Sequence, residues 1–206
     1  MLRFLYADDL AKRSRLSETM FQDRAKQFKD RLNWDVEVDA NGAERDAYDD
    51  LNPLYVIWET PQGTHGGSLR FLPTTGRTMV NEHFLDLTDG VRIESPFIWE
   101  CTRFCLAPDA SPRTSALLML AGLEVGLAAG LSHAVGVFDA RMVRIYRKIG
   151  WSPAILGRAS AGGEQISVGL WDFAPSYRPA LARKAGVSIE ALAHWQARGE
   201  GPKRAA

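Results

Sequence analysis

The first strong pattern along the chain is a run of apolar residues at three- and four-residue intervals from Leu16 to Leu32, which predicts a helix over residues 8–32. The pattern then stops. Residues 35–52 hold seven acids, one base and the pair Asn41-Gly42, a composition typical of a loop. Because loops of this length inside a domain are usually functional or disordered, we expect two or three of its acids to belong to a site.

Shorter apolar runs after this loop predict a series of strands and helices. Two strands joined by a Pro- and Gly-containing turn indicate a hairpin, and helices alternate irregularly with the later strands. The predicted strands cover residues 54–59, 67–72, 97–106, 132–138 and 165–171. The predicted helices cover residues 112–130, 139–149 and the segment from 180 onward. This order favours an α/β or α+β sheet with helices on both faces.

Length and charge narrow the class of protein. A chain of 206 residues suits one domain over 1–206, with 199–206 expected to fray. Its 25 basic and 25 acidic side chains give no global attraction to nucleic acid or to an anionic membrane. The apolar stretch 116–131 is interrupted by Glu124 and is shorter than the roughly 20 residues of a membrane span. No signal peptide is visible, so we expect a cytoplasmic protein.

Two charged residues lie inside the apolar strand 97–106. Glu100 and Arg103 both need partners there, because an unpaired buried charge costs several kcal/mol. Earlier segments offer candidates of both signs, namely Arg24, Arg70, Glu44, Asp46 and Asp49. Cys101 and Cys105 stand four apart on the same strand, about 13 Å at roughly 3.3 Å per residue, so they predict packed thiols rather than a disulfide.

Several common site motifs are absent from the sequence. It has no G-x-G-x-x-G after its first strand, no P-loop, no G-x-S-x-G elbow, and no metal-ligand spacing among its four histidines and two cysteines. A cluster of carboxylates and arginines remains. Such a cluster suits proton abstraction from an amine and recognition of a zwitterionic ligand, with no metal.

Four motifs in order resemble the LuxI-type acyl-homoserine-lactone synthases. They are Arg24-x₃-Phe28-x₅-Trp34, Glu44-x-Asp46-x-x-Asp49, Leu69-Arg70-x-Leu72-Pro73-Thr74-Thr75 and Trp99-Glu100-x-x-Arg103-Phe104. The resemblance implies a three-layer, N-acyltransferase-like (GNAT-like) fold, with a twisted and mostly antiparallel sheet that splays near its centre. It also implies an acyltransferase that makes a quorum-sensing signal.

The resemblance further implies the substrates and the reaction. The amine of S-adenosylmethionine is acylated from a thioester on acyl carrier protein or coenzyme A, and lactonisation then expels methylthioadenosine. S-adenosylmethionine is a substrate, and no cofactor is implied. Two alternatives stay open at this point: a coenzyme-A-dependent N-acetyltransferase of the same fold, and a non-catalytic sensor of a nucleoside or acyl ligand. Release of methylthioadenosine distinguishes the synthase from both.

Site roles follow from the resemblance by position. Glu100 is implied to assist deprotonation of the amine, directly or through water, and Asp46 and Arg103 complete the catalytic set. The implied S-adenosylmethionine pocket is Arg24, Phe28, Trp34, Asp49, Arg70 and Phe104. The implied acyl pocket is Thr102, Phe104, Leu118, Gly122, Val135, Gly136, Val137, Trp151 and Leu170. A basic helix is expected to dock the acidic carrier protein through Arg141, Arg144, Arg147 and Lys148.

Two finer expectations concern geometry and specificity. Family members that make 3-oxo signals tend to have Thr where this chain has Gly136, which argues against a 3-oxo acyl group. In a regular strand Glu100 and Arg103 face opposite sides of the sheet, because their separation is odd. We therefore predict a β-bulge between them that turns both toward one cleft.

Overall fold

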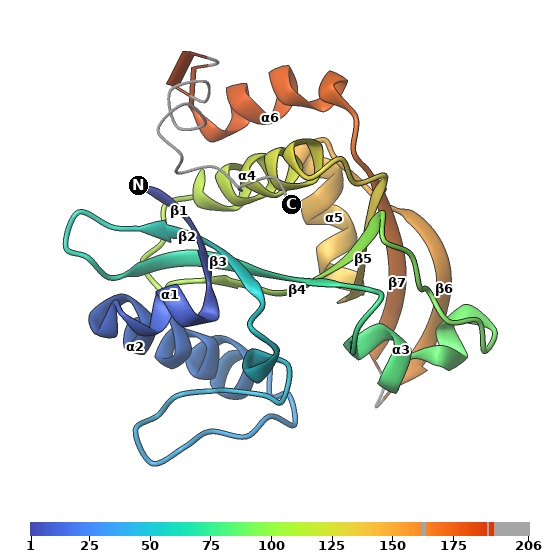
Figure 1. The fold of residues 1–206 in the computed structure, drawn as a ribbon, viewed down its shortest axis with the longest axis horizontal. Coiled ribbons are helices and arrows are strands. Elements are labelled where there is room, and N and C mark those ends of the chain that lie inside the picture. The colour runs from blue at the N-terminus through green and yellow to red at the C-terminus, as the bar shows by residue number, and fades with distance from the viewer. Residues whose placement is uncertain (162–163, 189, 192–206) are drawn as a thin grey trace.

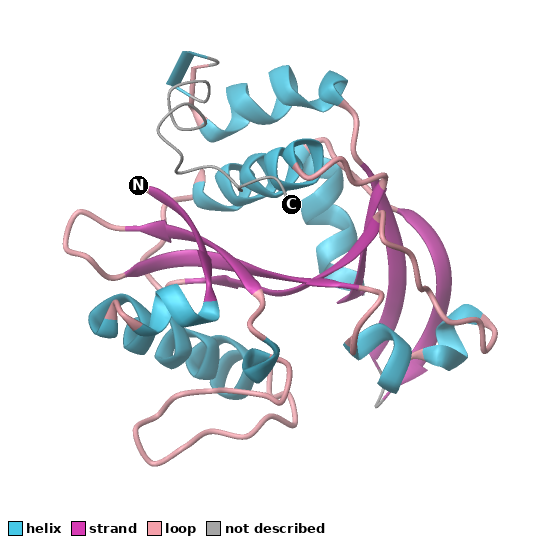
Figure 2. Cartoon of the chain, viewed as in Figure 1, coloured by secondary structure: helices cyan, strands magenta, loops and turns pink. Residues whose placement is uncertain are grey.

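The chain folds around one seven-stranded sheet with helices on both faces (Figures 1 and 2). The computed structural model describes residues 1–161, 164–188 and 190–191, so the predicted fraying of 199–206 lies outside the described residues. The strand order is β1-β2-β3-β4-β5-β7-β6. The strands are β1 (Leu2–Tyr6), β2 (Leu54–Glu59), β3 (His65–Pro73), β4 (Ile98–Leu106), β5 (His133–Asp139), β6 (Ala154–Ala161) and β7 (Glu164–Asp172).

The helices divide between the two faces of this sheet. Figure 1 shows α4, α5 and α6 above it, with α1, α2 and the acidic loop below. The α-helices are α1 (Ala7–Ala11), α2 (Ser14–Ala25), α3 (Met79–His83), α4 (Thr114–Ala128), α5 (Ala140–Ile149) and α6 (Arg178–Ala185). Shorter helical turns are the π-helix Lys26–Arg31 and the 3₁₀ turns Asp49–Leu51, Leu85–Thr88 and Pro175–Tyr177. None of the described helices is long and apolar enough to cross a membrane.

Most predicted elements are confirmed, and the differences are one divided helix, two strands and one helix, α3, that were not predicted, and one helix that begins later than predicted. The predicted helix 8–32 is in fact α1, α2 and a π-helical turn, with a break around Lys12–Arg13. Strands β1 and β6 were not predicted at all. Both are edge strands of the sheet, and an edge strand with one neighbour needs no long apolar alternation. The helix predicted from Pro112 begins two residues later, at Thr114.

Helix α5 begins and ends as the sequence predicts. Asp139 caps it by accepting hydrogen bonds from the backbone N–H groups of Arg141 at 2.9 Å and Met142 at 3.3 Å. Gly150 ends it with φ +93°, a left-handed conformation that favours glycine. These two signals fix where the basic residues of α5 lie relative to the end of β5.

The sheet splits between β4 and β5. These two strands run parallel, unlike the other neighbouring pairs, and only Ile98, Trp99 and Glu100 of β4 have partners on β5. Beyond Glu100 the strands diverge, while β4 continues to pair with β3 and β5 with β7. The split leaves backbone edges inside the molecule, and this is the splayed centre that the resemblance implies.

A β-bulge in β4 lies at the split. On β3 one residue separates Ser68 from Arg70, but two separate their partners Cys105 and Thr102 on β4. The extra residue is accommodated at Arg103, whose φ of +52° is left-handed and rare for a residue with a side chain. The predicted bulge is therefore confirmed and Arg103 borders the main cavity, but the prediction that Glu100 faces the same cleft is wrong, because Glu100 does not border it.

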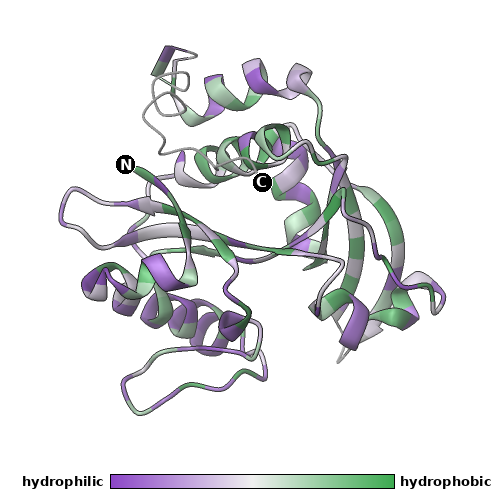
Figure 3. Cartoon of the chain, in the orientation of Figure 1, coloured by the Kyte–Doolittle hydropathy of each residue, from purple (hydrophilic) through white to green (hydrophobic). Residues whose placement is uncertain are grey.

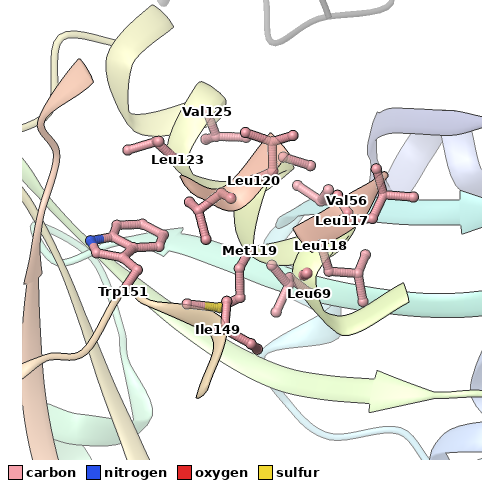
Figure 4. Packing of buried hydrophobic residues seen from close by; sticks show 14 of the residues in the cluster. Val56, Leu69, Leu117, Leu118, Met119, Leu120, Leu123, Val125, Ile149 and Trp151 are labelled. Carbon is pink, nitrogen blue, oxygen red and sulfur yellow. The ribbon is translucent and has the colours of Figure 1, made fainter. Parts of the chain in front are cut away.

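The main core lies between the sheet and α4. Figure 4 shows Leu118 of α4 close to Val56 and Leu69 of the sheet, in one cluster with Leu120 and Val125. In Figure 3, α4 is largely green, whereas α2 and the loop below it are largely purple. Two glycines let neighbouring side chains approach α4 closely: a Cβ on Gly126 would lie 2.2 Å from the Phe173 ring, and one on Gly122 would lie 3.3 Å from Leu69.

Candidate active site

A network of buried ion pairs joins α2, the acidic loop, β3 and β4. Arg24 and Arg70 are among the largest fully buried side chains, with 1% and 0% exposure. The network holds three arginines and three carboxylates, so its formal charges balance. Its members are Arg24, Arg70, Arg103, Glu44, Asp46 and Asp49.

Arg24 anchors the buried side of this network. Its Nη1 and Nη2 atoms each lie 2.9 Å from an oxygen of Asp49, a bidentate pair, and its Nε lies 2.5 Å from Glu44. Tyr55 donates to Asp49 at 2.6 Å as well. Burial alone raises the pKa of Asp49, but Arg24 and Arg70 outweigh it and hold that pKa well below its ordinary value. Asp49 is therefore a carboxylate at neutral pH.

Asp46 and Arg103 form the side of the network nearest the cavity. Arg103 Nη2 lies 2.7 Å from Asp46 and 2.9 Å from Glu44. Arg70 holds the same Asp46 carboxylate with two nitrogens, at 2.5 and 2.9 Å. Burial raises the pKa of Asp46, yet the hydrogen bond and charge of Arg70 lower it overall. Both Asp46 and Arg103 border the main cavity.

The main cavity has a volume of about 790 Å³ and passes through the split in the sheet. On the α2 face its wall includes the charged pair and a stacked aromatic pair, Phe28 and Trp34, with ring centroids 5.1 Å apart. On the α4 and α5 face its wall is mainly apolar and aromatic, with Asp139 as a charged member. That wall includes Leu69, Phe71, Met119, Gly122, Tyr146, Trp151, Trp171 and Phe173. One end of the cavity therefore suits a charged ligand and the other an apolar chain.

The cavity walls include most of the predicted pocket residues. Phe28, Trp34, Thr102, Phe104, Gly122, Gly136, Val137 and Trp151 all border it. Arg24, Asp49 and Arg70 lie one layer behind the wall and support Asp46 and Arg103. Leu118, Val135 and Leu170 were wrongly predicted as wall residues. Leu118 packs toward Gly67 of β3, and Val135 packs in a separate cluster with Val80 and Val168.

Glu100 is completely buried and also lies behind the wall. One of its oxygens accepts the backbone N–H of Val80 at 2.6 Å, and the other accepts that of Met79 at 3.0 Å. Burial raises the pKa of Glu100 despite these two hydrogen bonds. Met79 itself borders the cavity. The carboxylate is thus one residue away from the space where a substrate would lie.

Two residues support the site although the sequence interpretation gave Glu44 no role and missed Gln27 altogether. Glu44 joins Arg24 to Arg103; the sequence offered it as a candidate partner and as part of the second motif, but gave it no place in the site. Gln27 donates to the carbonyl of Phe104 at 2.7 Å and accepts from the N–H of Leu106 at 2.9 Å. It thereby replaces the strand neighbour that β4 lacks after the split. A polar residue in a helical pattern carries no sequence signal for such a contact.

A second cavity of about 520 Å³ adjoins the first and shares five wall residues with it. The shared residues are Gln27, Leu32, Phe104, Asp139 and Met142. Its remaining wall carries four basic side chains, Arg31, Arg141, Lys148 and Lys184. Arg144 and Arg147 of the predicted docking helix are exposed on α5 but do not border it. Within the described part of the chain, no group of His, Cys, Asp and Glu is arranged to hold a metal ion.

Comparison with known proteins gives a consistent picture. Residues 8–173 match the autoinducer synthase family. The acyl-homoserine-lactone synthase of Rhizobium etli is 44% identical over 179 residues, which cover 84% of each chain. The solved structure of BjaI, a CoA-dependent acyl-homoserine lactone synthase with SAM and isopentyl-CoA, has a TM-score of 0.82 at 21% identity and covers 96% of this chain and 99% of that one.

The N-acyltransferase-like architecture is also confirmed. A possible N-acetyltransferase from Lactobacillus plantarum superimposes with a TM-score of 0.56 at 14% identity, covering 84% of this chain and 99% of that one. At such low identity the likeness concerns the fold alone.

Proposed function

The chain belongs to the autoinducer synthase family, and from that membership and its site we infer that it is an acyl-homoserine-lactone synthase. It acylates the amine of S-adenosylmethionine from an acyl thioester, and the product then lactonises with release of methylthioadenosine. The observation that carries this inference is the cavity through the split sheet. It joins a wall bearing Asp46 and Arg103 to an apolar, aromatic wall.

The charged end of the cavity suits the methionyl part of S-adenosylmethionine. We assign this end to Asp46, Arg103, Phe28 and Trp34. An ammonium group finds a carboxylate in Asp46, a carboxylate group finds a guanidinium in Arg103, and the stacked rings of Phe28 and Trp34 offer a surface for an adenine or a sulfonium. The sulfonium is already a good leaving group, so lactonisation needs no metal to activate it.

Glu100 is assigned to deprotonation of the amine through a water molecule. An α-amino group has a pKa of about 7.7 to 8.0, so near neutral pH only a minority is nucleophilic and a base accelerates the attack. The buried position of Glu100 supports relay by water rather than direct contact, because its oxygens lie behind Met79. Its raised pKa makes it a better base than an exposed carboxylate.

The second cavity is assigned to the pantetheine arm of the acyl donor. Both coenzyme A and acyl carrier protein carry the acyl thioester at one end of this arm and a phosphate at its other end. Arg31, Arg141, Lys148 and Lys184 supply the positive charge that such a phosphate requires. We further propose that acidic carrier protein docks on the exposed basic face of α5, through Arg144, Arg147 and their neighbours.

Product analysis tests the proposed function. Purified protein is mixed with S-adenosylmethionine and with acyl thioesters of coenzyme A or carrier protein, and methylthioadenosine and lactone are measured by chromatography and mass spectrometry. We expect both products, and only when both substrates are present. An N-acylated product without methylthioadenosine would indicate an N-acetyltransferase instead. Ligand binding with no product would indicate a sensor.

A further inference from the structure

A hydrogen bond between two side chains joins the acidic loop 35–52 to α3 at the charged end of the main cavity. Tyr48 of the loop donates its hydroxyl to Glu82 of α3 over 2.8 Å. Tyr48 is 5% exposed and borders the cavity, whereas Glu82 does not border it. Both segments lie below the sheet in the view of Figure 1. The contact therefore fixes one part of the cavity wall relative to another.

Tyr48 belongs to the part of the loop that carries Asp46. Its backbone N–H donates to the Asp46 carboxylate at 3.0 Å, and the guanidinium carbon of Arg70 lies 5.6 Å from the centre of its ring. Asp46 is the carboxylate that we assign to the ammonium group of S-adenosylmethionine. The position of Tyr48 and the geometry of the ammonium site are therefore coupled.

Helix α3 provides a fixed support for this contact. Its first two backbone N–H groups donate to the buried Glu100 carboxylate. The Asn81 side chain makes two hydrogen bonds with the backbone of Ile93, at 2.8 and 2.9 Å, and Val80 packs in an apolar cluster with residues of β5 and β7. Because α3 is anchored in this way, a side chain that reaches from it to Tyr48 can hold the loop in place.

Arg77 prepares Glu82 to accept this hydrogen bond. Its Nε and Nη2 atoms lie 2.7 and 3.0 Å from the two carboxylate oxygens, a bidentate pair. These bonds and the one from Tyr48 lower the pKa of Glu82 to about 2, so it is a carboxylate at neutral pH. Burial and the nearby carboxylate raise the pKa of Tyr48, which keeps its proton and remains the donor. A hydrogen bond to a charged partner is stronger than one between neutral groups.

We propose that Glu82 is a positioning residue for S-adenosylmethionine: by holding Tyr48, it keeps the acidic loop against α3 and the charged end of the cavity in its binding shape. The inference rests on the proposed function. Glu82 does not border the cavity, so its effect on the ligand has to pass through Tyr48. The apolar end of the cavity lies on the other face of the sheet, so binding of the acyl donor does not depend on this contact.

Binding of S-adenosylmethionine without an acyl donor tests this role. Isothermal titration calorimetry at pH 7 gives Kd for wild type, Tyr48→Phe, Glu82→Met and the double variant. Phe keeps the ring and loses only the hydroxyl, while Met keeps the length and helix propensity of Glu. We expect each single variant to raise Kd by roughly three- to tenfold, the effect of about one hydrogen bond. The double variant should lie within twofold of the weaker single variant, because both changes remove the same contact.

The acyl donor supplies a second readout. Its KM, measured from methylthioadenosine release at saturating S-adenosylmethionine, should stay within twofold of wild type in all three variants. Tyr48→Phe leaves Glu82 paired with Arg77, so this variant should fold like wild type.

Two control variants separate positioning from a general loss of charge. Glu82→Gln keeps an oxygen that can accept from Tyr48, and should bind S-adenosylmethionine more tightly than Glu82→Met. Glu94→Met removes a carboxylate from the segment after α3, where the side chains of the Arg92–Glu94 pair are 54% and 58% exposed. It should leave Kd unchanged.

Three results would overturn the inference. The first is an unchanged Kd in Tyr48→Phe or in Glu82→Met. The second is additive losses in the double variant, which would mean that the two residues act separately. The third is an equal rise in Kd for S-adenosylmethionine and KM for the donor, which would mean that the whole cavity is distorted. Wild-type protein that releases no methylthioadenosine with any donor would instead refute the proposed function itself.

Discussion

Replacing Arg24 by Met is expected to destabilise the fold strongly, although Arg24 does not border the cavity. Met fills much of the same space but carries no charge. The change leaves Glu44 and two oxygens of Asp49 without the nitrogens that now lie 2.5 to 2.9 Å away. Glu44 has 0% exposure and Asp49 7%, so water cannot replace those contacts without opening the site.

The size of the effect follows from the cost of an uncompensated buried charge. Removing one partner of a buried pair costs about 3–5 kcal/mol. A domain of this size loses about 2–4 °C of Tm per kcal/mol, so we expect Tm to fall by roughly 6–20 °C. Arg70 and Arg103 still hold the two carboxylates in part, which favours the lower half of both ranges.

Urea unfolding at pH 7 measures this cost directly. The matched control is Lys12→Met, which breaks an ion pair with Asp9 whose side chains are 73% and 56% exposed. Exposed pairs contribute about 0–1 kcal/mol, so the control should unfold close to wild type. Adding Glu44→Gln to Arg24→Met removes one of the orphaned charges. The double variant should therefore lose less stability than the sum of the two single variants.

Two results would refute this reasoning. One is an Arg24→Met protein whose free energy of unfolding lies within about 1 kcal/mol of wild type, below the cost of an unpaired buried charge. The other is simple additivity in the double variant, which would mean that Glu44 does not depend on Arg24. Either result would show that the network tolerates a missing charge by admitting water.

Four further predictions concern the site. Glu100→Gln should fold but lose about 1–3 kcal/mol of its free energy of unfolding, because the amide oxygen can accept from only one of the two backbone N–H groups. It should also lose most turnover, and a kcat near that of wild type would show that Glu100 is not catalytic. Arg103→Ala should lower both kcat/KM and Tm, and an unchanged Tm would contradict its place in the network. Arg144→Glu with Lys148→Glu should raise KM for a carrier-bound donor but not for S-adenosylmethionine, and equal KM values would exclude docking there. The fold lowers the pKa of Asp49, so its carboxylate stabilises the protein above about pH 4, and this stabilisation is lost as the pH falls toward the folded pKa. Urea midpoints should therefore decrease below about pH 4, and they should decrease less in Asp49→Asn.

The charged site was largely predictable from the sequence. A buried charge needs a partner of the opposite sign, so Glu100 and Arg103 in an apolar strand implied a charged cluster. The partner that each charged residue takes within that cluster was not predictable. Arg103 pairs with Glu44 and Asp46, whereas Glu100 turns away to two backbone N–H groups of α3. A carboxylate can be satisfied by a guanidinium or by amides, and sequence gives no preference.

The acyl end of the cavity shows where sequence reasoning stops. Helix α4 is apolar around nearly its whole circumference, so periodicity cannot tell which of its sides meets the cavity. Met119 and Gly122 border it, while Leu118 packs elsewhere. All three are equally suited to a core or to an apolar pocket.

The sequence by itself determined the order of most strands and helices, the ends of α5, the family, and the need for a balanced charge cluster. Those features depend on local periodicity, capping and the cost of buried charge, which act over short stretches or on composition. Only the tertiary structure decided where the sheet splits, that Arg103 takes a left-handed conformation and borders the cavity, and which side chains of α4 and α5 form the cavity wall. Each of these depends on how distant elements pack together, and packing direction is not encoded in any single segment.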